Sequence, residues 1–204
     1  MAVIRPYVEA DRERVYDICV RTGNDGADAT DRFARPRLLA EIYAGPYLAL
    51  SPELAWVIDA GDGAIGYLLG VADTAAFETE SERSWWPALR AEYPLDSAAI
   101  GSPDRRLVEL IHRPPRTAPP VSGDFPAHLH VDLLPEAQGT GLGASLIRTL
   151  CAALTNRGVL GVHLGVSGTN TRAIGFYEHL GFTRLRGEYG VSADEIVFGL
   201  ALGS

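Results

Sequence analysis

Apolar residues recur with two different periods along this chain, and the change of period separates its elements. From Val159 to Val166 they alternate with other residues, as in a strand with one buried face, at Leu160, Val162, Leu164 and Val166. From Thr140 to Asn156 they recur at spacings of three and four, as in a helix with one buried stripe, at Leu142, Leu146, Leu150, Ala153 and Leu154. Gly158 stands where a cap would end that helix.

The same patterns predict the other elements. Further strands are expected at Ala2 to Pro6, Leu54 to Ala60, Ala64 to Ala72, Ala127 to Leu134, Phe182 to Glu188 and Glu195 to Ala201. Further helices are expected at Glu9 to Val20, Arg32 to Tyr43, Thr74 to Tyr93, and from a cap at Ser167 to Asn170 as far as Leu180. Pro36 can start or kink the second of these helices, Gly45-Pro46 ends it, and Gly61-Asp62-Gly63 joins two strands as a hairpin.

The stretch from Thr74 to Pro126 reads as an insertion between two strands. Within it, Arg105 to Ile111 fits either a helix or a strand, and the proline-rich part that follows is expected to be a loop. The order of elements predicts an α/β mixed sheet of about seven strands with helices on both faces. We expect residues 1–204 to form a single domain with an insertion at about 74–126.

Composition narrows the function classes. The 204 residues carry a net charge of −8, which argues against nucleic-acid binding, since clustered Lys and Arg hold a phosphate backbone. The two cysteines, Cys19 and Cys151, fall in predicted helices and read as buried thiols rather than a disulfide. No apolar run approaches a membrane span, and the expected location is the cytoplasm.

The stretch from Leu133 to Gly143 carries the clearest chemical signal. A strand runs into Pro135, and three glycines at alternate positions, Gly139, Gly141 and Gly143, then open a helix. The first N–H groups of a helix lack internal partners and sit at the positive end of its dipole, so they form a site for phosphate.

A glycine-rich stretch of this kind has three other interpretations. No Lys-Ser or Lys-Thr follows the glycines, so it is not a Walker loop. The next strand finishes Val166-Ser167-Gly168 without the acidic residue of a dinucleotide fingerprint. A tight turn without a ligand is the remaining alternative.

Two signatures in order resemble the GNAT superfamily of acyltransferases. The first is Gln138-Gly139-Thr140-Gly141-Leu142-Gly143, which follows an apolar strand and opens a helix. The second comes about thirty residues later as Asn170, Ala173, Phe176-Tyr177 and Leu180-Gly181-Phe182. The insertion departs from the compact pattern of the family. Thr22-Gly-Asn-Asp-Gly26 and the run from His128 to Pro135 also resemble a narrower group, bacterial GNAT proteins related to the acetyltransferase-like C-terminal domain of animal O-GlcNAcases.

The resemblance implies a site for acetyl-CoA as co-substrate. Its pyrophosphate would lie on the backbone amides of Gln138, Gly139, Thr140, Gly141, Leu142, Gly143 and Ala144. Its pantetheine arm would run along free backbone groups near Val131 and Leu133, which requires the central strand and the next one to splay apart. Phe176 and Tyr177 would complete this site. Asn170 resembles the residue that bonds the arm, and a plain helix cap is the alternative.

The reaction implied is attack of a primary amine on the thioester. The Leu133 N–H resembles the oxyanion donor of the family, and Tyr177 matches the acid that protonates the thiolate. The alternative for Tyr177 is a core aromatic, but Phe176 already fills the packing position. A base is needed because an alkylamine has a pKa of about 10.4.

Asp132 is the first choice for that base, because a carboxylate is unfavourable in an apolar strand and is expected there only where it has a role. One objection is that Asp132 shares a strand face with His128 and His130, whereas family bases lie at positions that hold Ala127 and Leu129 here. A bulge would move Asp132 across; otherwise it binds substrate or is structural.

Other polar groups have weaker signals. His128 and His130 have a spacing used for zinc, but no third ligand is evident and no metal is expected. The acidic loop from Thr22 to Asp31, with Asn24, Asp25 and Asp28, either attracts a cationic acceptor or is a solvated turn. Trp85 and Trp86 line an acceptor pocket, contact a second copy or simply pack.

These patterns predict an acetyl-CoA-dependent N-acetyltransferase acting on a small-molecule or peptidyl amine, as a monomer or homodimer, without nucleic-acid or membrane partners. Two alternatives stay open. One is a catalytically silent CoA-binding or protein-interaction domain, and the other is an enzyme that uses a different short acyl-CoA.

Overall fold

A mixed seven-stranded sheet forms the centre of the computed structural model, which describes residues 2–186, 189 and 195–203. The spatial order of the strands is β1-β2-β3-β4-β5-β7-β6. Their bounds are Val3–Pro6 (β1), Ala55–Asp59 (β2), Ala64–Val71 (β3), Ala127–Leu133 (β4), Gly161–Ser167 (β5), Thr183–Arg184 (β6) and Glu195–Ala201 (β7). The predicted class, an α/β mixed sheet, is confirmed.

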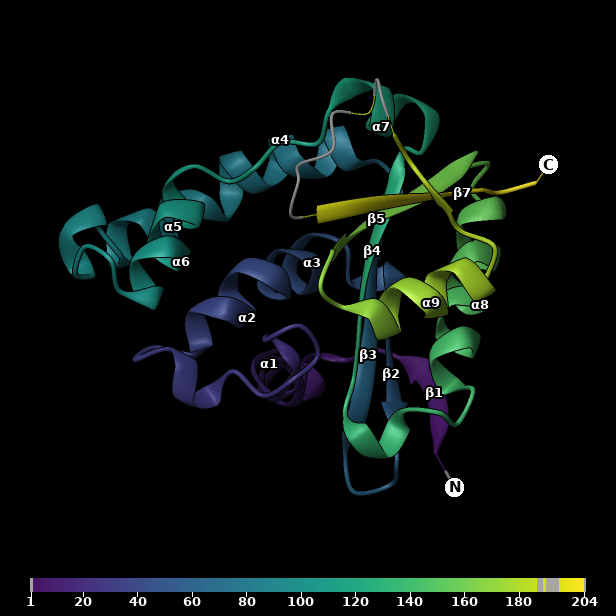
Figure 1. Cartoon of the computed structure of the whole chain (residues 1–204), viewed down its shortest axis with the longest axis horizontal. Coiled ribbons are helices and arrows are strands. Elements are labelled where there is room, and N and C mark those ends of the chain that lie inside the picture. The colour runs from purple at the N-terminus through teal and green to yellow at the C-terminus, as the bar shows by residue number, and fades with distance from the viewer. Residues whose placement is uncertain (1, 187–188, 190–194, 204) are drawn as a thin grey trace.

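Helices cover both faces of this sheet, as the alternating apolar pattern requires (Figure 1). On one face lie α1 (Arg12–Thr22), α2 (Arg37–Tyr43) and α3 (Gly45–Leu50). On the other lie α8 (Leu142–Thr155) and α9 (Thr171–His179). Each face has its own core: Val15, Ile18 and Leu48 are buried under the first group, and Leu146, Leu150 and Ile174 under the second.

The sheet opens between its two central strands. Every other pair of neighbours is antiparallel, but β4 and β5 are parallel and pair only at Ala127↔Val162 and His128↔His163. Beyond that point the strands diverge, and Figure 1 shows β5 and β7 running across the direction of β3 and β4. The splay that the GNAT resemblance implied is therefore present.

The segment between β3 and β4, called the insertion from here on, consists mainly of short helices. It consists of α4 (Thr74–Ser84), α5 (Trp86–Glu92), α6 (Pro103–His112) and α7 (Pro119–Asp124). The ambiguous stretch Arg105 to Ile111 is therefore helix. The prediction of a loop after it was wrong in part, because prolines at the first positions of α7 start a short helix there.

An apolar cluster of its own holds the insertion against α2. Leu38 and Leu39 of α2 pack with Leu107, Val108 and Ile111 of α6. Next to them the buried Asp104 carboxylate accepts hydrogen bonds from the Ala34 N–H at 2.9 Å and from Arg35 at 3.2 Å. These contacts place the insertion over the end of the sheet where β4 begins (Figure 1).

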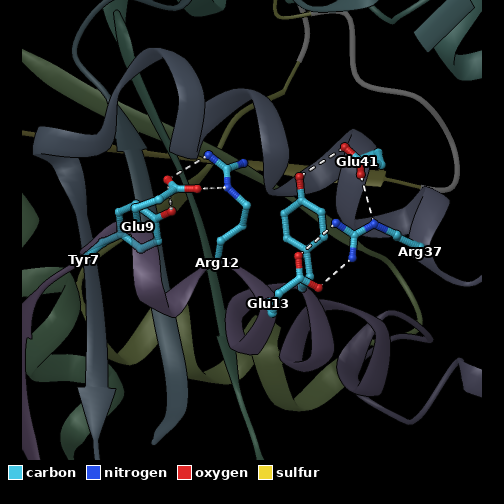
Figure 2. A network of polar contacts seen from close by, with 7 residues as sticks. Tyr7, Glu9, Arg12, Glu13, Arg37 and Glu41 are labelled. Carbon is cyan, nitrogen blue, oxygen red and sulfur yellow. Dashed lines mark hydrogen bonds and ion pairs between the residues drawn. The ribbon is translucent and has the colours of Figure 1, made fainter.

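Charged side chains tie α1 to α2 on the outside of the molecule (Figure 2). Arg37 donates to both carboxylate oxygens of Glu13, at 2.7 and 3.0 Å, and to Glu41 at 3.2 Å. The Tyr16 hydroxyl donates to the other oxygen of Glu41. A second set of contacts at the start of α1 joins Tyr7, Glu9 and Arg12. Together these contacts hold α1 against α2 and against the segment that precedes α1.

Several element boundaries differ from the prediction. Helix α2 begins only after Pro36, because the fixed φ of proline suits the residue before the first turn. Helix α2 ends at Tyr43 as predicted, and Gly45-Pro46 then begins α3, since proline is tolerated at the second position of a helix. Leu160 precedes β5 and is 69% exposed, so it does not share the buried face of that strand.

The predicted strand Phe182 to Glu188 is observed only as β6, and its end lies outside the described residues. Cys19 is buried and Cys151 half-buried, and both are free thiols. None of the described helices combines the length and apolar character needed to cross a bilayer.

Candidate active site

The glycine loop adopts the backbone that its sequence predicts. Gly139 and Gly141 have φ of +72° and +81°, in the left-handed region that disfavours residues with a Cβ. A Cβ at either position would meet no protein atom within 4 Å, so the loop faces open space. Gly143 is constrained by packing instead, since its Cβ would lie 2.8 Å from Leu133 and 3.4 Å from Phe176.

Hydrogen bonds hold this loop at the end of β4. The Gln138 side-chain amide donates to the Leu133 carbonyl at 2.7 Å, and the Thr140 hydroxyl donates to the Ala137 carbonyl at 2.7 Å. Helix α8 begins at Leu142, so the N–H groups from Leu142 to Ala144 have no partner within the helix. The predicted pyrophosphate amides thus lie together in one turn that can bind an anion.

Backbone groups of β4 face the splay at alternate residues. The Leu134 N–H donates to the Ile65 carbonyl, so the even-numbered residues of β4 bond to β3. The backbone groups of Val131 and Leu133 therefore point toward β5, which has already diverged at that level. This is the exposed strand edge that a pantetheine arm would need.

The acidic loop after α1 reaches across the splay. The Thr169 hydroxyl donates to the Asp25 carboxylate at 3.0 Å, which joins this loop to the turn between β5 and α9. Asn24 accepts from Arg32, and Asp28 accepts from the Thr30 N–H. The side chain of Thr30, followed by its backbone N–H, lowers the pKa of Asp28. Asp25 thus lies at the cleft, while Asn24 and Asp28 serve the fold of their own loop.

Asn170 caps α9, where its side-chain oxygen accepts from the Ala173 N–H at 3.1 Å. The capping role that was the plain alternative for Asn170 is therefore present. Its side-chain nitrogen lies near Gly26, at 3.8 Å from where a Cβ would be, so Asn170 also borders the acidic loop.

Tyr177 lies on α9 between two aromatic neighbours, with ring centroids 5.7 Å from Phe182 and 6.0 Å from Phe198. Its side chain is 8% exposed. Burial raises the pKa of the Tyr177 phenol, and the negative charge of Asp132 raises it further. The hydroxyl is therefore protonated at neutral pH and can donate.

Asp132 stays on the strand face that it shares with the histidines. The register of β3 and β4 runs from Gly66↔Leu133 to Val71↔His128 without a shift, so the bulge that would move Asp132 across is absent in these strands. The opposite face is filled instead, since Ala127 and Leu129 are buried in the core beneath α8. A base on that face is excluded by their side chains.

The Asp132 carboxylate has its own buried environment on the α1 side. The Tyr67 hydroxyl donates to it in a short hydrogen bond, while the nearby Thr22 hydroxyl donates to the Ile18 carbonyl at 2.8 Å. Burial nevertheless dominates and raises the pKa of Asp132 above its ordinary value. The negative charge of Asp132 also raises the pKa of Tyr177, so the two groups are coupled electrostatically.

His128 is fixed in one neutral form. The Thr74 hydroxyl donates to the Pro126 carbonyl at 2.7 Å, so its oxygen must accept from Nδ1–H of His128 at 2.8 Å. The Tyr47 hydroxyl then donates to Nε2 of His128 at 2.6 Å. Burial lowers the pKa of His128, consistent with this arrangement. Tyr47 and Thr74 had no motif around them in the sequence.

His130 is placed differently. Its ring lies edge-on to Tyr47 and Tyr43, with centroids 5.1 and 6.1 Å apart, and burial lowers its pKa to about 4. His163 of β5 comes close as well, 5.6 Å from His128. Within the described residues no three histidine, cysteine or acidic side chains are grouped so that they could hold a metal ion.

Comparison with known proteins agrees with this geometry. A profile of the Acetyltransferase (GNAT) family matches residues 109–182. The crystal structure of SsHAT is 41% identical, with a TM-score of 0.91, and the match covers 100% of this chain and 99% of that chain. A phosphinothricin acetyltransferase from Sinorhizobium meliloti, solved in complex with AcCoA, has the same fold at 18% identity, with a TM-score of 0.57 over 99% of this chain and 89% of that one.

This chain belongs to the GNAT family of acetyltransferases, whose fold supports acyl-CoA-dependent N-acetyl transfer. It is also homologous to a region of rat protein O-GlcNAcase, at 25% identity over 202 residues, which is 98% of this chain. The chain spans about a fifth of the length of these curated relatives, 22% of the rat and of the mouse protein O-GlcNAcase.

Proposed function

We propose that this chain is an acetyl-CoA-dependent N-acetyltransferase, built as one acyltransferase domain, that acts on a primary amine. The observation that carries the proposal is the open edge of β4. The backbone groups of Val131 and Leu133 face the splay, and the glycine loop presents helix amides at its end. The GNAT relative solved in complex with AcCoA supports acetyl as the acyl group.

In the proposed mechanism three groups of this chain act on the reacting atoms. Asp132 takes a proton from the amine, directly or through water, while the nitrogen forms a bond to the thioester carbon. The Leu133 N–H donates to the thioester oxygen as negative charge develops on it. The carbon–sulfur bond then breaks, and the Tyr177 hydroxyl gives its proton to the departing thiolate.

Calorimetric titration with acetyl-CoA tests the first half of this proposal, and we expect one saturable site. No saturable binding would exclude the proposed function. A screen of amine acceptors for release of free thiol then separates an active enzyme from a silent CoA-binding domain.

Replacing Tyr177 tests the mechanism. In Tyr177→Phe we expect kcat to fall about a hundredfold or more, because the acid is lost, while acetyl-CoA affinity stays nearly the same. Tyr93→Phe, in the insertion, is the matched control and should keep its turnover. Unchanged turnover in Tyr177→Phe would show that the acid is another group.

A further inference from the structure

A cavity of about 400 Å³ lies beneath the insertion, at the level where β4 and β5 separate. The parts of β4 and β5 at which their pairing ends form one wall. Helices α4 and α5 of the insertion form the opposite wall. Residues on these walls include His128, His130, Leu164, Gly165, Ser81 and Trp86. The cavity therefore adjoins the strand edge assigned to the acyl donor but is built from different residues.

Ser81 provides an unused hydrogen-bonding group in this cavity. Its residue is 2% exposed, and its hydroxyl has no hydrogen-bond partner among the described residues. Ser84, on the same helix, bonds to the Glu80 carbonyl at 2.8 Å, as helical serines commonly do. A buried polar atom left without a partner is unfavourable, so a ligand that pairs with Ser81 would remove this penalty.

His130 provides a second unused hydrogen-bonding group, on the opposite wall of the cavity. No hydrogen bond to its ring is found among the described residues, whereas both ring nitrogens of His128 are engaged. His163 uses Nδ1 to bond the Phe125 carbonyl at 2.7 Å. His130 is thus the neutral imidazole that can accept or donate to a molecule in the cavity.

The remaining walls are mainly apolar and aromatic, with two carboxylates at their edge. Tyr47 and Phe77 pack against each other with centroids 4.6 Å apart, and Trp86 lies nearby on the cavity wall. Glu78, which pairs with Arg116 at 3.5 Å, and Glu195 also line the cavity. Such a surface suits a molecule with an apolar body and one positive charge.

We propose that this cavity binds the acceptor, and that the acceptor is a compact amphipathic primary amine carrying a second hydrogen-bonding group. The apolar body lies against the aromatic rings, the second polar group pairs with Ser81, and the nitrogen lies on the His130 side next to the splay. This inference rests on the proposed function, because a bound amine is an acceptor only if the protein transfers an acetyl group. Because α6 is packed against α2, the insertion side of the cavity is held in place. A small molecule therefore fits the cavity better than a folded protein surface does.

Calorimetric binding of tyramine and phenethylamine tests the cavity without any turnover. The two amines differ by one hydroxyl, so we expect tyramine to bind roughly three- to tenfold more tightly. Ser81→Ala should abolish that difference, and the matched control Ser84→Ala should preserve it. The NMR signals of the His130 ring should shift on binding, and thermal unfolding checks that both variants are folded.

Ala118→Trp, at the edge of the cavity, should weaken both amines while leaving acetyl-CoA affinity unchanged. If tyramine binding is the same in wild type, Ser81→Ala and Ala118→Trp, the inference is overturned even when acetyl transfer is active. Preferred binding of spermidine or of a lysine peptide would overturn it too. Absence of acetyl-CoA binding with intact tyramine binding would overturn the proposed function and leave the cavity assignment in place.

Discussion

The two halves of the candidate site are built in different ways. The acyl-donor half uses backbone, with the edge of β4 and the amides of the glycine loop, and its residues lie close together in the chain. The acceptor half uses side chains from the sheet and the insertion, and Ser81 and His130 are 49 positions apart in the sequence. A backbone site binds what every member of a family shares, whereas a side-chain cavity can differ from one member to another.

Removal of Asp132, the proposed base, should have the largest effect. Asp132→Asn is expected to lower kcat/KM by about 10²–10⁴, because the amide cannot take the amine proton. Stability at pH 7 should not fall, since a carboxylate whose folded pKa is raised destabilises the fold once it is ionised. Steady-state kinetics and denaturant unfolding measure both quantities.

Asp62→Asn, in the exposed β2–β3 turn, is the control for that substitution and should change neither quantity. A kcat/KM within a few-fold of wild type in Asp132→Asn would show that Asp132 is structural. The base would then have to be sought on the acceptor side, where His130 lies.

Acid should destabilise the fold through His130, which belongs to the acceptor half. The unfolded histidine binds a proton near pH 6.5, but His130 in the fold binds one only near its pKa of about 4. Between these values the unfolded state holds more protons, so stability falls as the pH falls. Through this group alone, the free energy of unfolding should be about 2 kcal/mol lower at pH 5 than at pH 7.

Denaturant unfolding of His130→Asn at the two pH values checks this expectation, because the variant should lose less stability on acidification than wild type. His179→Asn, an exposed position on α9, serves as control and should follow the wild type. An equal loss in His130→Asn and wild type would mean that His130 is already protonated or solvated in the fold.

A substitution in the glycine loop should affect only the acyl-donor half. Gly141→Ala places a Cβ at a φ of +81°, which costs about 1–2 kcal/mol, so we expect acetyl-CoA affinity to fall about tenfold with amine binding unchanged. Gly101→Ala has nearly the same φ, +82°, and equally open surroundings. It should lose similar stability but keep its acetyl-CoA affinity, as titration can show.

The smallest effect is expected on the outer surface. Glu13→Gln breaks the contact between Glu13 and Arg37 that ties α1 to α2, and exposed ion pairs contribute little. We expect Tm to fall by under about 2 °C, with no change in either binding constant. A change in amine affinity would instead show that this network positions the acidic loop at the cleft.

The contrast between the halves also explains what could be predicted from sequence. The glycine loop was predicted because its backbone needs glycine at Gly139 and Gly141, and such a need is visible as residue type and spacing. The splay followed from the GNAT resemblance. In contrast, Thr74 and Tyr47 fix His128 from 54 and 81 residues away, and no local pattern marks such partners.

Packing decided the remaining differences. Asp132 was correctly placed with His128 and His130 by strand alternation, but only the unbroken β3–β4 register showed that no bulge moves it. Trp86 was left open between an acceptor pocket, a contact with a second copy and packing. It packs, because α5 lies against α2, and it also borders the cavity.

The short pairing of β4 and β5 has a consequence for how the molecule moves. The strands from β1 to β4 and those from β5 to β7 form two subsheets joined by two residue pairs. A bound arm that bonds to the Val131 and Leu133 amides would act as an eighth strand shared by both subsheets. Acyl-donor binding should then slow amide hydrogen exchange along that edge and make the two subsheets open as a single cooperative unit.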